Sequence, residues 1–133
     1  MLIDIAIETE LEIILRGANG MYVATDSSAR SIFVSEKDDA EKFTVYMVDS
    51  STIQLYSKRI LKYVTRWADF VAPRKAISDN FCNFKIGEIN NGEIITLQGD
   101  NNNYISHLSV NGNNYLMLNR NIMDLNAMFY VEY

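Results

Sequence analysis

Short stretches of the chain alternate between apolar and polar positions. Ile53-Gln54-Leu55 and Phe84-Lys85-Ile86 are two examples. A period of two residues is typical of a strand with one buried face, and β-branched and aromatic residues dominate these stretches. No long stretch has the period of an amphipathic helix, although residues 38–42 could form one helical turn. The pattern therefore predicts an all-β fold.

The apolar positions recur along the chain in three units. A tyrosine followed by an aliphatic residue occurs three times at equal spacing, as Tyr22-Val23, Tyr63-Val64 and Tyr104-Ile105. An aliphatic-x-leucine step precedes each pair, and a phenylalanine follows each pair, at a wider interval in the third case. These anchors predict a single domain over residues 1–133 built from pseudo-repeats at about 11–48, 49–89 and 90–133, the third with four additional residues.

Each unit has room for about four strands of ordinary length. The third strand of each unit is the hardest to place, and we predict it near residues 32–34, 70–71 and 115–117. Asn-Gly pairs at 19–20, 91–92 and 111–112 predict type I′ hairpin turns, because both residues tolerate positive φ. Six asparagines between 101 and 114 fit turns as well, or could hydrogen-bond a polyol.

With these anchors the chain resembles the β-trefoil proteins of the fascin and hisactophilin type. The resemblance covers residues 11–133, and the segment from Gly92 to Ser106 is especially similar to the repeat of that group. It implies a six-stranded barrel capped by three hairpins, and relatives that bind actin, sugars or other proteins. The predicted core consists of Ile13, Leu15, Tyr22, Val23, Phe43, Val45, Ile53, Leu55, Tyr63, Phe84, Ile86, Ile95, Leu97, Tyr104, Phe129 and Val131.

Residues 1–10 precede the first unit. Ile3, Ile5 and Ile7 alternate with other residues as in an additional strand. This strand would either lengthen the first strand against residues 129–133 or form an edge that pairs with a second subunit in a homodimer.

Composition narrows the classes of function. Hydrophobic residues make up 48% of the 133 residues and charged residues 22%, as in ordinary globular domains. No apolar run approaches the roughly 18 residues of a membrane span, and the acidic beginning does not resemble a signal peptide. We therefore expect a cytoplasmic protein, or one released without a signal peptide. The net charge of −5 argues against nucleic acid as a partner.

The inventory of reactive side chains argues against an enzyme. Cys82 is the only cysteine and His107 the only histidine. We expect Cys82 to lie on the inward face of the strand that contains Phe84, as a buried and unreactive thiol, and His107 to lie at the surface. No metal-binding or nucleotide-binding motif occurs, so no metal or cofactor is expected. No sequence motif indicates a pair of catalytic carboxylates of the glycosidase type. An enzyme that uses such a pair is our third hypothesis.

The charges are unevenly distributed. Residues 1–50 carry a net charge of −6, residues 51–87 of +5 and residues 88–133 of −4. The only tryptophan, Trp67, lies in the basic segment, in what we predict to be the turn after the Tyr-Val strand. The candidate ligand-binding residues are Trp67, Arg66, Asp69, Lys62 and Arg59.

Three interpretations of this basic segment compete. A sugar ring could stack on Trp67 while Arg66 and Asp69 bond its hydroxyls. Trp67 could instead cover the open end of the barrel, with the bases neutralised by acids of the neighbouring units. The basic face could also meet an acidic face of another molecule at Glu36, Asp38, Asp39 and Glu41.

The leading hypothesis is a non-catalytic, lectin-like carbohydrate-binding module, and the alternative is a protein-binding module, for example for actin.

Overall fold

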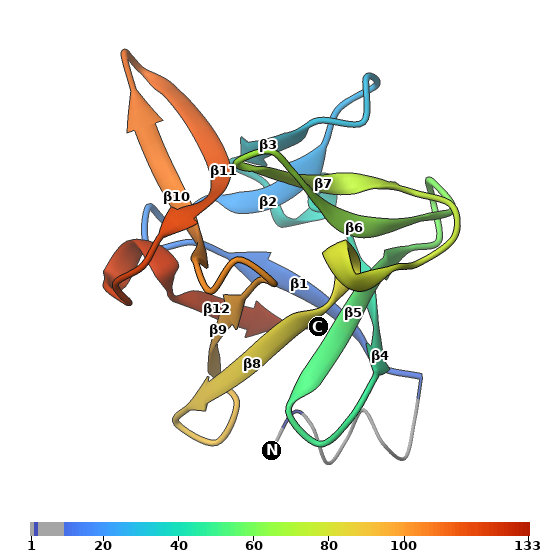
Figure 1. Cartoon of the computed structure of the whole chain (residues 1–133). Coiled ribbons are helices and arrows are strands. Elements are labelled where there is room, and N and C mark those ends of the chain that lie inside the picture. The colour runs from blue at the N-terminus through green and yellow to red at the C-terminus, as the bar shows by residue number, and fades with distance from the viewer. Residues whose placement is uncertain (1, 3–9) are drawn as a thin grey trace.

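The computed structural model describes residues 2 and 10–133, and strands dominate it (Figure 1). Three times in succession, three strands are followed by a short 3-10 turn and a fourth strand. The elements are β1 (Glu12–Arg16), β2 (Tyr22–Thr25), β3 (Ser31–Val34), η1 (Lys37–Asp39), β4 (Phe43–Met47), β5 (Thr52–Ser57), β6 (Lys62–Trp67), β7 (Phe70–Lys75), η2 (Asn80–Cys82), β8 (Phe84–Ile89), β9 (Ile94–Gln98), β10 (Tyr104–Val110), β11 (Asn113–Arg120), η3 (Leu125–Ala127) and β12 (Phe129–Glu132). The predicted all-β class is confirmed, and all three uncertain third strands form at the predicted places.

Six of the strands pair in a cycle. The antiparallel pairings run from β1 to β4, β5, β8, β9 and β12, and β12 pairs back with β1. The last pairing places Leu15 opposite Val131, so that the first and last strands of the described residues lie side by side. Every strand of the cycle therefore has a neighbour on both sides, which leaves no unpaired edge along the cycle.

The other six strands form three hairpins, β2–β3, β6–β7 and β10–β11, which occupy the upper part of Figure 1. Their second strands converge. β11 pairs with β7 at Met117 and Phe70, and both β7 and β11 contact β3. The Ser31 hydroxyl on β3 donates a hydrogen bond of 2.5 Å to the carbonyl of Val71 on β7.

The register shows where the four additional residues of the third unit lie. In the first two hairpins, Tyr22 pairs with Val34 and Tyr63 with Lys75, across intervals of equal length. In the third, Tyr104 pairs with Arg120, across an interval that is longer by four. The interval from each of these partners to the following phenylalanine is the same in all three units. The insertion therefore lengthens the β10–β11 hairpin, which projects well beyond the rest of the molecule in Figure 1.

The core contains most of the predicted residues, but not the tyrosines. Tyr22, Tyr63 and Tyr104 are only half-buried, and Val131 is half-buried too. Neighbouring residues of a strand point to opposite faces, and the buried positions go to Val23, Val64 and Ile105. A phenol also needs a partner for its hydroxyl, and Tyr22 donates to Glu132 at 3.4 Å. The predicted tyrosine anchors thus lie at the margin of the core.

Two details of the turns differ from the predictions. Asn91-Gly92 and Asn111-Gly112 both have positive φ, as type I′ turns require, but at positions 19–20 only Gly20 does. The short helical turn predicted at 38–42 forms over 37–39.

Of the N-terminal segment, the structure describes residue 2 and then the chain from residue 10 onward. The predicted N-terminal strand, with Ile3, Ile5 and Ile7, lies outside the described residues. Leu2 is buried, and its backbone N–H donates to Glu88 Oε1 at 2.7 Å. No helix in the described part of the chain is long and apolar enough to cross a bilayer.

Candidate functional site

A cleft of about 570 Å³ opens where the three hairpins meet. All three contribute to its walls. The side chains that give it its chemical character are aromatic, charged or amide-bearing: Asp26, Arg30, Trp67, Phe70, Arg74, Asn113, Asn114 and Tyr115. Because Asn113, Asn114 and Tyr115 belong to the lengthened hairpin, the insertion forms one wall of the cleft.

Trp67 and Phe70 form the aromatic part of the cleft. They flank the two-residue turn of the β6–β7 hairpin as a cross-strand pair, with ring centroids 6.2 Å apart. Trp67 is 58% exposed and Phe70 42% exposed. Trp67 therefore ends strand β6, rather than lying in the turn as predicted. Apolar rings that stay this exposed at a concave surface are typical of binding sites.

The guanidinium group of Arg74 lies against Trp67. Its Cζ is 4.6 Å from the ring centroid, within the range of a cation–π interaction. The same side chain donates from Nε to the Ala29 carbonyl at 3.2 Å and from Nη2 to the Ser28 carbonyl at 3.5 Å. Arg74 thereby connects the second hairpin to the turn of the first.

Asp26 and Arg30 form the charged rim on the first hairpin. Asp26 accepts hydrogen bonds from the backbone N–H groups of Ser28 and Arg30, and from Arg30 Nε at 3.0 Å. The backbone N–H of Arg30 is the largest cause that holds the pKa of Asp26 below its usual value. Asp26 is thus ionised at neutral pH and paired with a base of its own turn.

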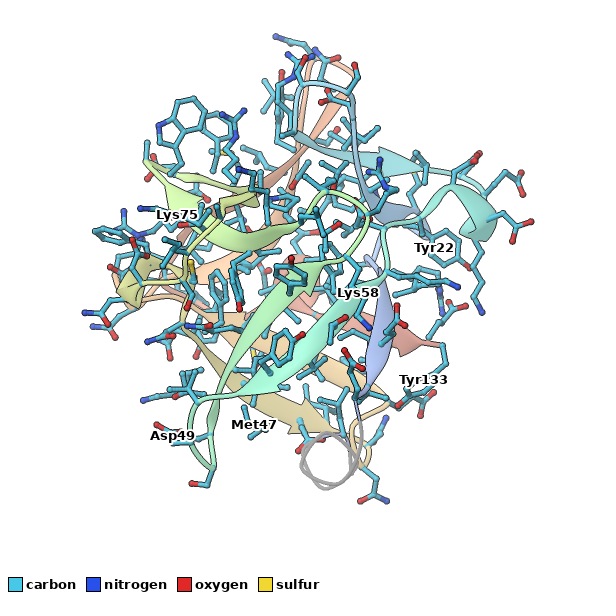
Figure 2. The ribbon with its side chains drawn as sticks, turned by 90° about the vertical axis from the view of Figure 1, so that its right-hand side faces the viewer. Tyr22, Met47, Asp49, Lys58, Lys75 and Tyr133 are labelled. Carbon is cyan, nitrogen blue, oxygen red and sulfur yellow. The ribbon has the colours of Figure 1, made fainter. Side chains whose placement is uncertain are left out.

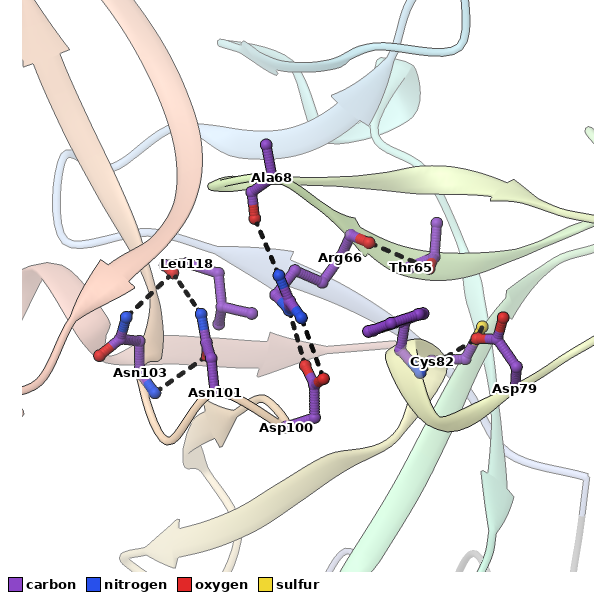
Figure 3. A network of polar contacts seen from close by, with 10 residues as sticks. Thr65, Arg66, Ala68, Asp79, Cys82, Asp100, Asn101, Asn103 and Leu118 are labelled. Atoms are coloured by element: carbon purple, nitrogen blue, oxygen red, sulfur yellow. Dashed lines mark hydrogen bonds and ion pairs between the residues drawn. The ribbon is translucent and has the colours of Figure 1, made fainter.

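Arg66 lies outside the cleft. It lines a smaller neighbouring hollow with Thr65 and Lys75, and it points toward the third unit (Figure 3). Its Nε and Nη2 donate to the two carboxylate oxygens of Asp100 at 2.7 and 3.0 Å, and its Cζ is 5.0 Å from the centroid of Phe81. The donors that we expected to meet sugar hydroxyls are therefore occupied by a carboxylate of the protein itself.

The other candidate residues do not line the cleft. Arg59 donates to both oxygens of Glu41, and Lys62 is half-buried on β6. Asp69 is exposed in the turn between Trp67 and Phe70. The structure thus brings only Trp67, of the five predicted residues, to the cleft; whether the others bind a ligand stays a prediction.

Several bases of the segment 51–87 pair with acids elsewhere in the chain. Besides the two pairs above, Lys58, labelled in Figure 2, lies 2.8 Å from Glu10. Glu41, which we expected on an acidic face, is instead buried beside Arg59. The prediction that Glu41 belongs to an exposed acidic face is therefore wrong, because Glu41 pairs with a base of its own chain instead of facing a second molecule.

The cysteine and the histidine contact different residues. Cys82 is buried in η2 rather than on a strand, its Sγ lies 3.7 Å from Asp79 Oδ1, and burial raises the pKa of its thiol. His107 is buried on β10 and not at the surface, with Phe33 edge-on at 4.9 Å.

The imidazole has amide partners. His107 Nε2 lies 2.7 Å from Asn114 Oδ1 and 3.3 Å from Asn19 Nδ2. These contacts compensate the cost of burying the ring nitrogen. Nothing in the sequence around His107 predicts them. No group of three metal-ligating side chains occurs among residues 2 and 10–133.

Most of the cleft residues were not predicted as ligand-binding residues. Arg74 belongs to the basic segment 51–87 and Tyr115 to the strand predicted near residues 115–117, and neither was singled out as a ligand-binding residue. The signal that could have found them is the expected hairpin cap, since residues near the ends of three converging hairpins must meet.

Neither the comparison with protein-family models nor that with curated proteins finds a match for this chain.

Proposed function

We propose that the chain is a β-trefoil and acts as a non-catalytic, lectin-like carbohydrate-binding module. The cycle of six paired strands, the three converging hairpins and the recurring order of elements support a threefold barrel with a hairpin cap. In such a fold the hairpin ends are free to vary, because the core is formed below them.

The cleft between the hairpins carries the functional part of the proposal. Its volume of about 570 Å³ lies within the range of small-ligand sites, roughly 300–1,000 Å³. The exposed rings of Trp67 and Phe70 offer apolar surface to the face of a sugar ring. Asn113, Asp26 and Arg30 beside them offer donors and acceptors for hydroxyl groups.

A purely binding role is supported by the placement of the reactive groups. A cysteine nucleophile needs a base within hydrogen-bond reach, and the contacts of Cys82 and His107 share no residue. The raised pKa of the thiol keeps it protonated at neutral pH.

The proposal is tested by titration with neutral and acidic oligosaccharides. Trp67 is the only tryptophan, so a change in its fluorescence reports directly on the cleft. We expect saturable binding that calorimetry also detects, and a loss of about tenfold or more in affinity for Trp67→Ala, or roughly 1.4 kcal/mol. Tyr133→Ala is the matched control, because Tyr133 is 62% exposed and does not line the cleft. No binding across a broad glycan panel would overturn the proposal.

A second candidate is a protein-binding module of the fascin and hisactophilin type. The observation in its favour is an exposed apolar loop that leads into η3, where Ile122 and Met123 in the loop and Leu125, the first residue of η3, are 67%, 45% and 70% exposed. Such a cluster suits a protein surface. Co-sedimentation with actin filaments at low and high salt tests this candidate, and wild-type behaviour of Ile122→Ser would count against the loop.

A further inference from the structure

We propose that the ligand of the cleft is an acidic saccharide, whose carboxylate is bound by Arg74, and that each chain binds one. This inference rests on the proposed carbohydrate-binding function and names the class of sugar. It comes from the way in which the charges around Trp67 are paired.

Four bases surround Trp67 in the cleft and in the smaller hollow beside it: Arg30, Arg66, Arg74 and Lys75. Three of them already have a carboxylate partner, in the pairs Arg30–Asp26, Arg66–Asp100 and Lys75–Asp79. Within residues 2 and 10–133, Arg74 has none. The surplus positive charge of the site is therefore located on one side chain.

Arg74 is held in place without being neutralised. Its partners are two backbone carbonyls and the face of Trp67, which orient the guanidinium group but leave its charge uncompensated. No partner occurs for Nη1 among the described residues. A guanidinium group that is fixed in advance loses little entropy when it binds a carboxylate, and such a charge-assisted hydrogen bond is stronger than one between neutral groups.

The position of Arg74 couples the charge to the aromatic surface. Its Cζ is 4.6 Å from the Trp67 centroid, so a ligand that contacts the ring also comes within reach of the guanidinium group. The pair Asp26–Arg30 on the first hairpin contributes no net charge, which leaves a total of +1 for the charged residues that line the cleft; Asp69, in the turn between Trp67 and Phe70, does not line it. In a protein with a net charge of −5, this is a local preference for an anion.

The equivalent positions of the other units do not repeat this arrangement. Counted from the residues that pair with the three tyrosines, the positions equivalent to Arg74 hold Phe33 and Asn119. Arg74 lies at a register shift between β6 and β7, and β2 and β3 pair without such a shift. The residue that matches Trp67 in the first unit is Asp26. The lengthened hairpin that forms one wall of the cleft belongs to the third unit, and the first two hairpins are both shorter by four residues. We therefore expect one site per chain rather than three.

The test compares sugars that carry a carboxylate with neutral sugars of related structure. Lactose is titrated against 3′-sialyllactose, and galactotriose against trigalacturonic acid, with Trp67 fluorescence and calorimetry as readouts. At low salt we expect the acidic member of at least one pair to bind about tenfold more tightly or better, with a stoichiometry of one. The preference should shrink at high salt, because the ions screen the exposed charges.

Variants assign the preference to one residue. Arg74→Met should remove the preference for the acidic sugar over the neutral one, and Arg74→Lys should retain part of it. Lys85→Met is the matched control, since it removes one positive charge from the same segment outside the cleft. Because Arg74 is exposed, we expect all three variants to fold, and melting curves check this.

The outcomes separate this inference from the proposed function. Equal binding of acidic and neutral sugars would overturn the inference and leave the carbohydrate-binding function standing. Binding of no sugar would overturn both. Acetate at matched ionic strength is the remaining control: a response to acetate equal to that of the acidic sugar would show a site for any small anion, and would also overturn the inference.

Discussion

At the scale of single residues, charged side chains connect units that are distant in the sequence. Arg66 on β6 reaches Asp100 in the loop after β9 through two hydrogen bonds (Figure 3). Its guanidinium group also lies over the ring of Phe81, with Cζ 5.0 Å from the centroid. Both members of the pair are partly shielded from solvent, with side chains 22% and 28% exposed. This geometry favours a larger contribution than that of a fully exposed ion pair.

Acid should weaken this contact. The hydrogen bonds from Arg66 hold the pKa of Asp100 below its usual value of 3.8. A carboxyl group with a lowered pKa in the folded state stabilises the protein above its unfolded pKa, and this stabilisation is lost as the pH falls through the folded value. We expect Asp100→Asn to reduce the free energy of unfolding by about 1 kcal/mol at pH 7. The difference from wild type should shrink steadily below pH 4.

Urea unfolding of both proteins between pH 7 and pH 2.5 provides the measurement. Asp38→Asn is the control, because Asp38 is exposed and has no ion pair in the described part of the chain. A difference for Asp100→Asn that stays constant down to pH 2.5 would contradict this role of the charge pair.

Single residues were predicted unevenly from the sequence. Trp67 was predicted in the turn after the Tyr-Val strand, with its role left open, and it lies at the end of β6 with 58% exposure. His107 was misplaced, since its burial depends on amide groups of Asn19 and Asn114, 88 and 7 residues away in the chain. Alternation identifies which face of a strand is apolar, but not which polar groups meet across strands.

At the scale of elements, the β10–β11 hairpin is the part that departs from the recurring pattern. Its outer end consists of the pairs Ser109–Asn114 and Val110–Asn113 around the Asn111-Gly112 turn. The sequence showed that the third unit is four residues longer. Only the register shows that all four lie in this hairpin, because strand positions alone leave the place of an insertion open.

Shortening this hairpin should separate binding from folding. Deleting the two outer pairs removes Ser109, Val110, Asn113 and Asn114, and joins the turn directly to the next pair, Leu108–Tyr115. Two residues are lost from each strand, so the remaining side chains keep their faces. We expect the protein to fold with a loss of about 1–3 kcal/mol, since His107 loses its bond to Asn114. Sugar affinity should fall about tenfold or more.

The measurements are urea unfolding and sugar titration. Val110→Thr serves as the control, because Val110 is exposed in the same hairpin and does not line the cleft. Wild-type affinity in the shortened protein would show that the additional residues do not form a functional wall.

At the scale of the whole molecule, the cleft results from the way in which the hairpins meet. No hairpin has both the aromatic pair and the amide wall, and β7 and β11 pair across only one position. The sequence predicted the strands and most of the core because these follow local alternation. It did not predict the cleft residues, because their proximity depends on contacts between strands of different units, which lie far apart in the sequence.

A shared core also makes the three units unfold together. Phe43, Phe84 and Phe129 begin the fourth strand of each unit, and all are buried. Each belongs to a strand that pairs with a neighbouring unit, so a cavity at any one of them weakens the same cluster. We expect Phe43→Ala, Phe84→Ala and Phe129→Ala each to cost about 3–5 kcal/mol and to keep one cooperative transition.

Urea unfolding followed by circular dichroism and by tyrosine fluorescence tests this expectation. Phe81→Ala is the control, since Phe81 is 44% exposed and should cost about 1 kcal/mol or less. Coincident transitions with similar losses would show that the units form one thermodynamic structure. If one variant instead gave two separate transitions, the damaged unit would be unfolding alone, and the paired cycle could not be the source of the stability of the whole chain.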